Sequence, residues 1–532
     1  MTKYIFITGG VVSSLGKGII ASSIGKLLKS RGYSVFHQKF DQYINVDPGT
    51  MNPIEHGEVF ITDDGTEADL DLGHYERFSN VSLNKYSTLT SGKVYLSVIT
   101  KERRGEYLGK TLQIVPHITD EIKNFIREGV AKNNNPDFVI VEVGGTVGDI
   151  EGLYFYEAIR QFRLDVGEDN TLFLHTVLVP FLETTEELKT KPAQHSVMTL
   201  RGIGIQPDVL VCRTSHPMSD SEKNKLALFT NVARNSIIEC IDMKSIYQVP
   251  LVLEKEGLAR EILKKFKIED KKPDLKKWEN IVDKILNSKN KVKVGIVGKY
   301  VKLHDAYLSV VEALKHAGAS VDCAVEVKWI DSEDIKSQND AKKQLSDCNG
   351  IIVPGGFGNR GIEGKIQAIE YVRKNNIPFL GICLGMQLSV IEFARNVVGI
   401  KDATSLEFDA KAQNPVISLM DEQMNIIDKG GTMRLGAYDC SIIDGTLAKD
   451  CYKQNTISER HRHRYEVNNN YKEILEKNGL TFSGLSPNGK LVEMVELKDK
   501  KFFIASQFHP ELKSRLENPH PLFVGLVKHC MK

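Results

Sequence analysis

The sequence predicts an α/β protein made of two doubly wound, mostly parallel-sheet domains. Two observations support this prediction. Short apolar runs rich in Val, Ile and Phe alternate with amphipathic stretches in both halves of the chain, and such runs are typical of strands buried on both faces of a parallel sheet. A chain of 532 residues is also too long for a single hydrophobic core.

Five apolar runs in the first half predict strands, and amphipathic helices such as 17–30 lie between them. The predicted strands are 4–8, 34–39, 137–143, 171–179 and 208–213. In the second half, the predicted strands are 292–297, 325–330, 350–353, 378–383 and 502–507, and the predicted helices are 306–316, 362–374 and 384–394. A polar stretch with one helix separates the halves, so we expect domains at 1–267 and 291–532 and a linker at 268–290.

Charge and cysteine usage argue against several functions. Lys and Arg total 70 and Asp and Glu total 69, so the net charge of +1 provides no general attraction to nucleic acid or to an anionic membrane. No apolar stretch approaches the roughly 20 residues that a membrane-spanning helix needs. The eight cysteines include no Cys-x-x-Cys pair, which argues against a zinc ribbon. Without an export signal, we expect free thiols in the cytoplasm.

The first predicted strand runs into a Gly-rich turn, Gly9-Gly10-Val11-Val12-Ser13-Ser14-Leu15-Gly16-Lys17-Gly18, which opens a helix. Such a turn directs backbone N–H groups and a helix dipole at one point, and Lys17 adds a charge, which together favour a phosphate. The turn departs from the usual P-loop: five residues separate Gly10 from Gly16, and Gly18 replaces the Ser or Thr that helps to bind magnesium. A turn that merely allows close packing is the alternative.

Because Gly18 offers no metal ligand, carboxylates must provide one. Glu142 ends a buried strand and Asp71 lies in a polar run, and magnesium on nucleotide phosphates takes one or two carboxylates. A solvated loop acid is the alternative for Asp71. Lys39 follows the second strand, and the run 189–195 places two lysines beside a proline. Surface lysines usually serve solubility, but both runs follow strands that end at the same sheet edge, which favours a second polyphosphate site.

The second half contains Gly381-Ile382-Cys383-Leu384-Gly385 between an apolar strand and a helix. Flanking glycines permit a tight turn, and a helix N-terminus favours a reactive thiolate. The alternative is a small buried hydrophobic residue. His509 and Glu511 lie two residues apart, so in an extended chain they would face the same side as base and orienting acid. Residues 355–358 follow another strand and offer N–H groups for an oxyanion hole.

The most basic short run is Arg460-His461-Arg462-His463-Arg464. Nucleic-acid binding is disfavoured because no wider basic surface surrounds this run. Two histidines without further spaced ligands do not make a metal site. We expect one or more of the arginines to recognise an anion, and a solvated face is the alternative.

These motifs carry a family resemblance that covers essentially the whole chain. The first half resembles the synthetase domain of the CTP synthase family through 8–18, 43–59, 69–78, 142–151 and 189–197. The second half resembles a class I glutamine amidotransferase domain through 355–358, 381–387, 460–468 and 507–511. Two departures are Gln42, where the family often has Pro, and the loosely matching stretch 214–221.

The resemblance implies an ATP-dependent amination of UTP to CTP through a 4-phosphorylated intermediate, with ammonia taken from glutamine. It implies catalysis by Cys383, His509 and Glu511 and magnesium binding by Asp71 and Glu142. The implied ATP-binding residues are Ser14, Leu15, Gly16, Lys17, Gly18, Ile19, Lys39, Asp71, Ile241, Asp242 and Met243. The implied UTP- or CTP-binding residues are Ser13, Asp149, Ile150, Glu151, Lys189, Thr190, Lys191, Pro192, Ala193, Gln194 and Lys225. The implied glutamine-binding residues are Gly356, Leu384, Gly385, Met386, Gln387, Glu407 and Arg464.

The resemblance further implies activation by GTP, feedback inhibition by CTP, a homotetramer and an internal ammonia tunnel. Two other functions compete with it. An amidotransferase acting on corrinoid carboxylates would share the chemistry but lack the runs 69–78 and 189–194. A P-loop switch protein would have no need of Cys383, His509 and Glu511 together.

Overall fold

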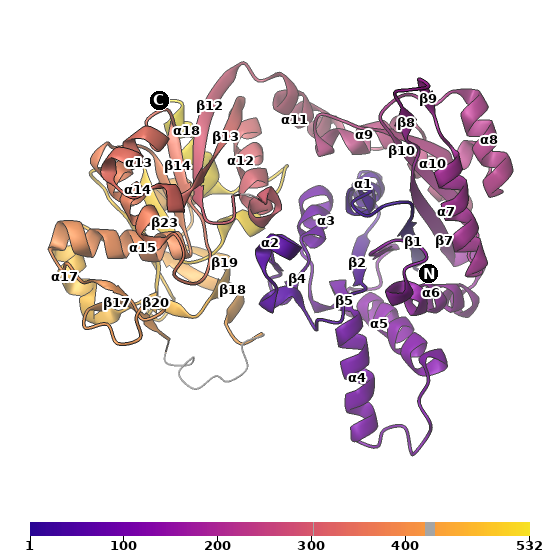
Figure 1. Cartoon of the computed structure of the whole chain (residues 1–532), viewed down its shortest axis with the longest axis horizontal. Helices are drawn as coiled ribbons and strands as arrows, with labels where there is room; N and C mark the ends of the chain where they lie inside the picture. The colour runs from indigo at the N-terminus through magenta and orange to yellow at the C-terminus, as the bar shows by residue number, and fades with distance from the viewer. Residues whose placement is uncertain (302, 421–430) are drawn as a thin grey trace. The chain divides into compact units, whose positions relative to one another are not determined.

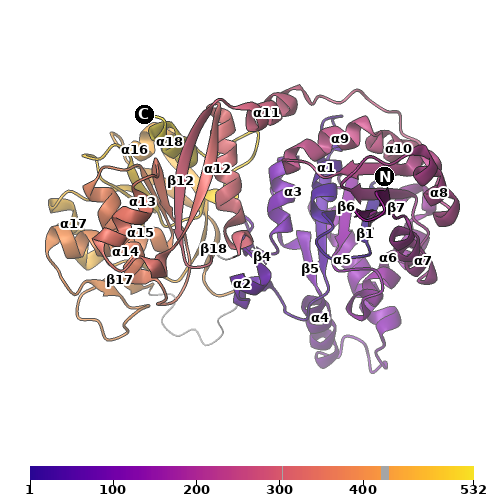
Figure 2. The same ribbon diagram turned by 45° about the horizontal axis from the view of Figure 1, so that its top comes forward.

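The computed structural model describes residues 1–301, 303–420 and 431–532. They form two compact units: the first unit consists of 1–47 and 71–279, and the second unit of 48–70 and 280–532. Each unit contains one large β-sheet covered by helices (Figures 1 and 2). Among the described helices, none has both the length and the apolar character that crossing a membrane requires.

The sheet of the first unit has seven strands in the order β11-β10-β7-β1-β6-β2-β5, all parallel. They are β1 (Lys3–Gly9), β2 (Val35–Asp41), β5 (Thr88–Thr90), β6 (Phe138–Val143), β7 (Thr171–Leu178), β10 (Val209–Thr214) and β11 (Ile237–Ile241). The central strands are buried along nearly their whole length, as the apolar runs of a parallel sheet require. The five predicted strands are confirmed, whereas the sequence does not single out the short edge strands β5 and β11.

Helices cover this sheet and continue into the connector. They are α1 (Lys17–Lys29), α3 (Asp71–Ser79), α4 (Ser91–Arg103), α5 (Thr119–Lys132), α6 (Leu153–Val166), α7 (Lys191–Gly202), α8 (Asp220–Thr230), α9 (Val249–Lys255), α10 (Leu258–Lys265) and α11 (Lys276–Asn287). The helix predicted within the connector is confirmed as α11. The polar composition of the connector favours exposure, but part of it is buried: the Trp278 ring packs against Phe78 and its Nε1–H donates to the Tyr247 carbonyl at 2.8 Å.

The sheet of the second unit has nine strands in the order β13-β12-β14-β15-β23-β22-β21-β18-β19. They are β12 (Asn290–Gly298), β13 (Cys323–Asp331), β14 (Gly350–Val353), β15 (Phe379–Ile382), β18 (Arg434–Ile442), β19 (Thr456–His463), β21 (Thr481–Leu485), β22 (Val492–Glu496) and β23 (Phe503–Ser506). The five predicted strands form the parallel part, from β13 to β23. The other four strands extend the sheet in antiparallel fashion and are not anticipated by the sequence.

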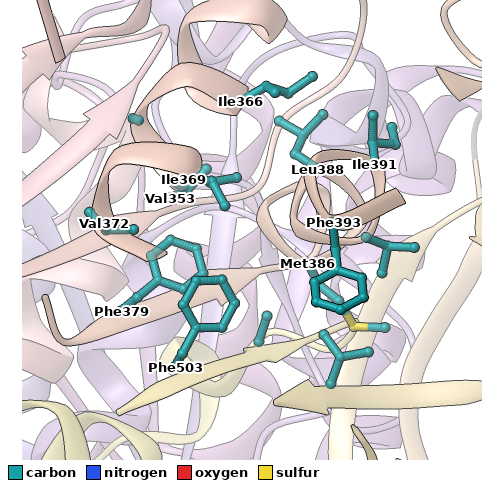
Figure 3. Close-up of a cluster of buried hydrophobic side chains, with 14 of the residues drawn as sticks. Val353, Ile366, Ile369, Val372, Phe379, Met386, Leu388, Ile391, Phe393 and Phe503 are labelled. Atoms are coloured by element: carbon teal, nitrogen blue, oxygen red, sulfur yellow. The ribbon is translucent and has the colours of Figure 1, made fainter. Parts of the chain in front are cut away.

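Helices form two cores on the faces of this second sheet. They are α12 (Leu308–Ser320), α13 (Gln338–Leu345), α14 (Ile362–Lys374), α15 (Leu384–Phe393), α16 (Leu447–Tyr452), α17 (Lys472–Lys477) and α18 (Pro521–Cys530), with a small sheet of β16 (Thr404–Ser405), β17 (Pro415–Leu419) and β20 (Tyr465–Val467) beside them. Figure 3 shows one core, in which the rings of Phe379 and Phe503 stack with centroids 4.5 Å apart. Met386 and Phe393 of α15 point into the same core.

Residues 48–70 belong to the second unit although they lie near the start of the chain. They contain α2 (Pro53–His56) and the hairpin β3 (Phe60–Ile61) and β4 (Glu67–Ala68). Asp63 pairs with Arg460 at 2.7 Å and Glu67 pairs with Arg462 at 2.8 Å, both on β19. The Ser309 N–H of α12 donates to Glu58 at 2.7 Å. Buried ion pairs and hydrogen bonds therefore hold this segment against the second unit.

Candidate functional sites

The Gly-rich turn joins β1 to α1 through a strained backbone. Val11, Ser14 and Gly16 have φ of 86°, 56° and 89°, a region that residues other than glycine rarely adopt, and strain of this kind concentrates at functional sites. The Lys17 ammonium donates to the Gly145 carbonyl at 2.7 Å, and its burial lowers the pKa of Lys17. The turn thus presents a lysine and a helix N-terminus at one point, as phosphate binding requires.

Two carboxylates lie beside Gly18 in the first turn of α1. A methyl group on Gly18 would come 2.1 Å from Asp71 Oδ1 and 3.5 Å from Glu142 Oε2, so glycine leaves the space that these acids occupy. The Lys39 ammonium contacts Asp71 and lies 3.3 Å from Asp41 Oδ1 and 3.7 Å from Glu142 Oε1. Burial raises the pKa of Glu142 to about 7, although the positive charge of Lys39 opposes this.

Asp71 and Glu142 fit the ligand set of a nucleotide-bound magnesium ion. Within the described ranges, no group of three or more His, Cys, Asp and Glu side chains is arranged to hold a metal by itself. Magnesium at nucleotide sites usually takes only one or two carboxylates and completes its shell with phosphate and water. Two acids beside a phosphate-binding turn are therefore the donor set that such an ion needs.

A cavity of about 140 Å³ adjoins the Gly-rich turn. Its lining contains the predicted ATP-binding residues Leu15, Gly16, Ile19, Ile241, Asp242 and Met243, together with Ile20, Thr176, Arg213, Cys240, Ile246 and Val249. The mostly apolar lining suits a flat heterocyclic base. Arg213 of β10 is a member that the sequence analysis missed: it donates to Asp242 Oδ1 at 2.8 Å and to the Ser14 carbonyl at 3.1 Å. A lone arginine at the end of a strand carries no local signal that would have revealed it.

The residues predicted to bind UTP or CTP lie on several segments, two of which approach the Gly-rich turn. Helix α7 includes Lys191–Gln194 and also Ser196, which lies close to Gly10. A methyl group on Gly10 would come 1.7 Å from the Ser196 hydroxyl. The loop 146–151 follows β6, and Asp149 accepts the Thr146 N–H at 2.7 Å. Lys225 lies on α8, which contacts α7. The loop 146–151 and α7 therefore border the Gly-rich turn, whereas α8 reaches this region only through its contact with α7.

In the second unit, Cys383 stands between β15 and α15 in a strained conformation, with φ 52° and ψ −103°. The residues two positions before and two positions after Cys383 must be glycines. A methyl group on Gly385 would come 2.0 Å from the Val353 carbonyl, and one on Gly381 would come 2.8 Å from Ala505. The thiol therefore sits at the first turn of a helix on a sharp elbow, the arrangement that exposes a nucleophile for attack.

His509 and Glu511 form a base and its orienting acid, since His509 Nδ1 and Glu511 Oε1 are 2.7 Å apart. Residues Pro510–Lys513 form a 3₁₀ turn, so the two side chains meet across a turn rather than along an extended chain as predicted. Burial lowers the pKa of His509, but the negative charges of Glu511 and of Cys383 outweigh it and raise the pKa to about 10. His509 Nε2 is buried and makes no hydrogen bond within the described residues, which leaves it available to the thiol.

The loop after β14 lies beside this pair. A methyl group on Gly355 would come 2.9 Å from His509 Cε1 and 3.6 Å from Cys383 Cβ, so the glycine loop borders both reacting groups. Glu407 accepts the Gly358 N–H at 2.8 Å, and the buried Lys299 donates to the Gly358 carbonyl at 3.0 Å. Burial lowers the pKa of Lys299 to about 8. These contacts fix the loop that the sequence marks as an oxyanion hole.

The predicted glutamine-binding residues differ in what they expose. Leu384 and Met386 belong to a buried hydrophobic core, in which Figure 3 shows Met386, so only their backbone groups can face a substrate. The Gln387 amide donates to the Tyr465 carbonyl at 3.0 Å, and Arg464 donates to Thr432 Oγ1 at 2.8 Å. Of the arginines predicted to recognise an anion, Arg460 and Arg462 pair with acids of segment 48–70 instead.

A cavity of about 90 Å³ lies at the thiol. Its lining includes the three predicted catalytic residues, Gly355 and Gly356, together with Pro53, Glu58 and Val59 of segment 48–70. The remaining lining residues are Tyr300, Ala306, Tyr307, Val310, Pro354, Phe357, Arg462 and Leu512. Segment 48–70 thus contributes to the wall of the thiol site. The sequence analysis missed this contribution, because that segment resembles the synthetase half of the family.

Comparison with known proteins identifies the family to which both halves of the chain are similar. A family model described as CTP synthase N-terminus matches residues 3–268, and one described as glutamine amidotransferase class-I matches residues 302–529. The chain is 59% identical over 528 residues to a CTP synthase of Caldanaerobacter subterraneus subsp. tengcongensis, covering 99% of this chain and 98% of the relative. It is 58% identical over 532 residues to a CTP synthase of Carboxydothermus hydrogenoformans, covering 100% and 99%. A solved glutaminase domain of Trypanosoma brucei CTPS with bound acivicin is 41% identical, with a TM-score of 0.43, and covers 45% of this chain and 93% of that one.

Proposed function

The chain belongs to the CTP synthase family, and on this premise we propose how its own residues make CTP from UTP, ATP and glutamine. The observation that carries the proposal is the presence in one chain of two complementary sites. A strained thiol with a His–Glu pair can release ammonia, and a phosphate-binding turn with two carboxylates can activate an acceptor. We assign the first activity to residues 291–532 and the second to 1–267, joined by 268–290.

At the thiol site, Cys383 Sγ bonds to the amide carbon of glutamine and the carbon–nitrogen bond breaks. His509 gives its proton to the departing nitrogen, and Glu511, at 2.7 Å from His509 Nδ1, holds the ring. Backbone N–H groups of the Gly355–Gly356 loop and of Leu384 stabilise the developing oxyanion. Water then attacks the thioester with His509 as base, which releases glutamate and restores the thiol. Glu407 and Arg464 would bind the α-amino and α-carboxylate groups of glutamine.

At the synthetase site, the uracil 4-oxygen of UTP takes the γ-phosphoryl group of ATP, and ammonia then displaces phosphate at C4. The Gly-rich turn and Lys17 would hold the ATP phosphates, the cavity at Ile241–Met243 would hold adenine, and the segments 149–151 and 189–194 with Lys225 would hold UTP or CTP. Magnesium bound to Asp71 and Glu142 would neutralise phosphate charge. The family resemblance also supports GTP activation, CTP feedback inhibition, a homotetramer, an ammonia tunnel and a cytoplasmic location.

The test is the absorbance change of the pyrimidine ring with UTP, ATP and magnesium, with either glutamine or ammonium chloride as nitrogen source. Wild type should make CTP from both sources, and Cys383→Ala only from ammonia, because the thiol is needed only for glutamine. If wild type makes no CTP from either source, the substrate assignment is wrong. If Cys383→Ala retains glutamine-dependent synthesis, Cys383 is not the nucleophile.

A further inference from the structure

Gln507 lies beside the nucleophilic elbow and is held there by the backbone. It follows β23, which pairs with β15, the strand that leads to Cys383. The Cys383 N–H donates to the Ser506 carbonyl at 2.7 Å, and the Gln507 N–H donates to the Glu493 carbonyl at 2.8 Å. The Gln507 side chain is fully buried. Its position relative to the thiol is therefore set by the sheet and does not depend on a flexible loop.

The Gln507 carboxamide joins the thiol to a predicted glutamine-binding residue. Its Nε2 lies 3.7 Å from Cys383 Sγ, and its Oε1 accepts from Gln387 Nε2 at 3.2 Å. Gln387 Nε2 also donates to the Tyr465 carbonyl at 3.0 Å. This second contact fixes the orientation of both amides. Because the Tyr465 carbonyl can only accept, the NH₂ end of Gln387 must face it. Gln507 must then turn its oxygen towards Gln387, which directs the Gln507 NH₂ group at the Cys383 sulfur.

The neighbours of the sulfur affect its two protonation states in opposite ways. The Cys383 S–H donates to the Arg462 carbonyl across 3.8 Å, a contact that favours the neutral thiol because a carbonyl repels a thiolate. An amide N–H aimed at sulfur favours the thiolate instead, since hydrogen bonds to charged acceptors are stronger than those to neutral ones. In a buried site, where water cannot replace it, such a donor has a large effect.

We propose that Gln507 is a positioning residue of the glutaminase reaction: its carboxamide stabilises the Cys383 thiolate and at the same time orients Gln387 towards the substrate. The inference rests on the proposed function of Cys383 as nucleophile. Gln507 itself bonds to no reacting carbon or nitrogen. Its action is to hold the sulfur in the attacking form, and, by engaging Gln387 Nε2, to leave the Gln387 carbonyl oxygen as an acceptor for glutamine.

The test compares Gln507→Met, which keeps the volume but lacks a donor, and Gln507→Glu, which keeps the shape but places an acid against the sulfur. Gln338→Met is the control, because the Gln338 amide contacts Gln367 and Glu370 and not Cys383. Alkylation of Cys383 by iodoacetamide is followed by peptide mass spectrometry from pH 5 to 10. We expect neutral-pH alkylation to slow about tenfold in Gln507→Met and further in Gln507→Glu, with both pH profiles displaced upward.

Steady-state glutamine hydrolysis completes the test. We expect kcat/KM to fall about tenfold or more in both variants, through kcat as well as KM, with ammonia-dependent CTP synthesis reporting that the chain has folded. An alkylation profile of Gln507→Met that superimposes on wild type overturns the proposal, even if KM for glutamine rises. If Gln507→Met fails to fold, the nearly isosteric Gln507→Glu decides by the same criterion. Failure of the proposed function is distinct, because it appears in Cys383→Ala.

Discussion

The Arg434 guanidinium and the Glu493 carboxylate face each other at 2.7 and 3.3 Å, and both side chains are buried. Glu466, also buried, accepts from the same guanidinium at 3.0 Å. The three residues join β18, β22 and β20. One arginine therefore compensates two buried acids in the second unit.

Replacing Arg434 by Met should destabilise the second unit strongly, because it leaves two buried acids without their cation. Breaking a buried ion pair costs about 3–5 kcal/mol, which for a unit of this size lowers the unfolding midpoint by roughly 6–20 °C. Thermal unfolding followed by circular dichroism measures the shift. The control is Lys477→Ala, which removes an exposed pair with Glu473 (2.6 Å) and should change the midpoint by about 1 °C. Equal midpoints for both variants would contradict the assignment.

Gly18→Ala should strongly reduce CTP synthesis from both glutamine and ammonia. The added methyl group would come 2.1 Å from Asp71 Oδ1, and Asp71 is also held by Lys39, so the carboxylates have to separate. We expect at least a tenfold loss of ammonia-dependent synthesis, while alkylation of Cys383 continues at the wild-type rate. Gly202→Ala is the control, because its methyl group would meet nothing within 4 Å. Full activity of Gly18→Ala would remove the steric argument for the carboxylate site.

Glutamine hydrolysis should decline as the pH rises through about 10. The raised pKa of His509, about 10, keeps the imidazole protonated at neutral pH, so it can pair with the thiolate and then protonate ammonia. Glu511→Gln removes the largest cause that raises this pKa, so the alkaline decline should move to lower pH and kcat should fall about 10–100-fold. A pH profile of kcat/KM for wild type and Glu511→Gln measures both effects. Coinciding alkaline limbs would show that Glu511 does not control the histidine.

The proton on the His509 imidazole also contributes to the stability of the fold, and the direction of its pH dependence follows from the raised pKa. The folded-state pKa of His509 lies above the ordinary value of 6.5, so its contribution to the free energy of unfolding is fully present below about pH 6.5. It is lost progressively as the pH rises to about 10. The thermal unfolding midpoints of wild type and Glu511→Gln, measured across this pH window, should therefore differ at low pH and converge at high pH.

Arg213→Met should raise KM for ATP about tenfold with little change in KM for glutamine. Arg213 connects Asp242 to the Ser14 carbonyl at the adenine cavity, so its loss loosens both the turn and the wall of the cavity. Arg234→Met is the matched control: this arginine pairs at 2.6 Å with Asp220, whose side chain is 92% exposed. Initial rates at varied ATP with saturating ammonia measure the effect. A KM no different from that of Arg234→Met would exclude Arg213 from the site.

The sequence predicts the parallel strands and the elbow well, because burial on both faces and steric crowding impose residue types that can be recognised. Gly18 illustrates this: as an exception to the P-loop pattern it directs attention to Asp71 and Glu142, which the structure places beside it. Arg213 and Gln507 could not be assigned from sequence, since their roles depend on partners brought close only by folding. The antiparallel strands β18–β22 were equally hidden, because their mixed polar pattern also suits exposed loops.

The early position of segment 48–70 in the chain has a consequence for biosynthesis. Asp63 leaves the ribosome 397 residues before its partner Arg460, which at about 5–20 residues per second is a delay of roughly 20–80 s. During that interval its acids and apolar residues have no native surface to bind. The glutaminase pocket is therefore closed by the first and last parts of the nascent chain together, and a fragment begun at the connector would be born without one of its walls.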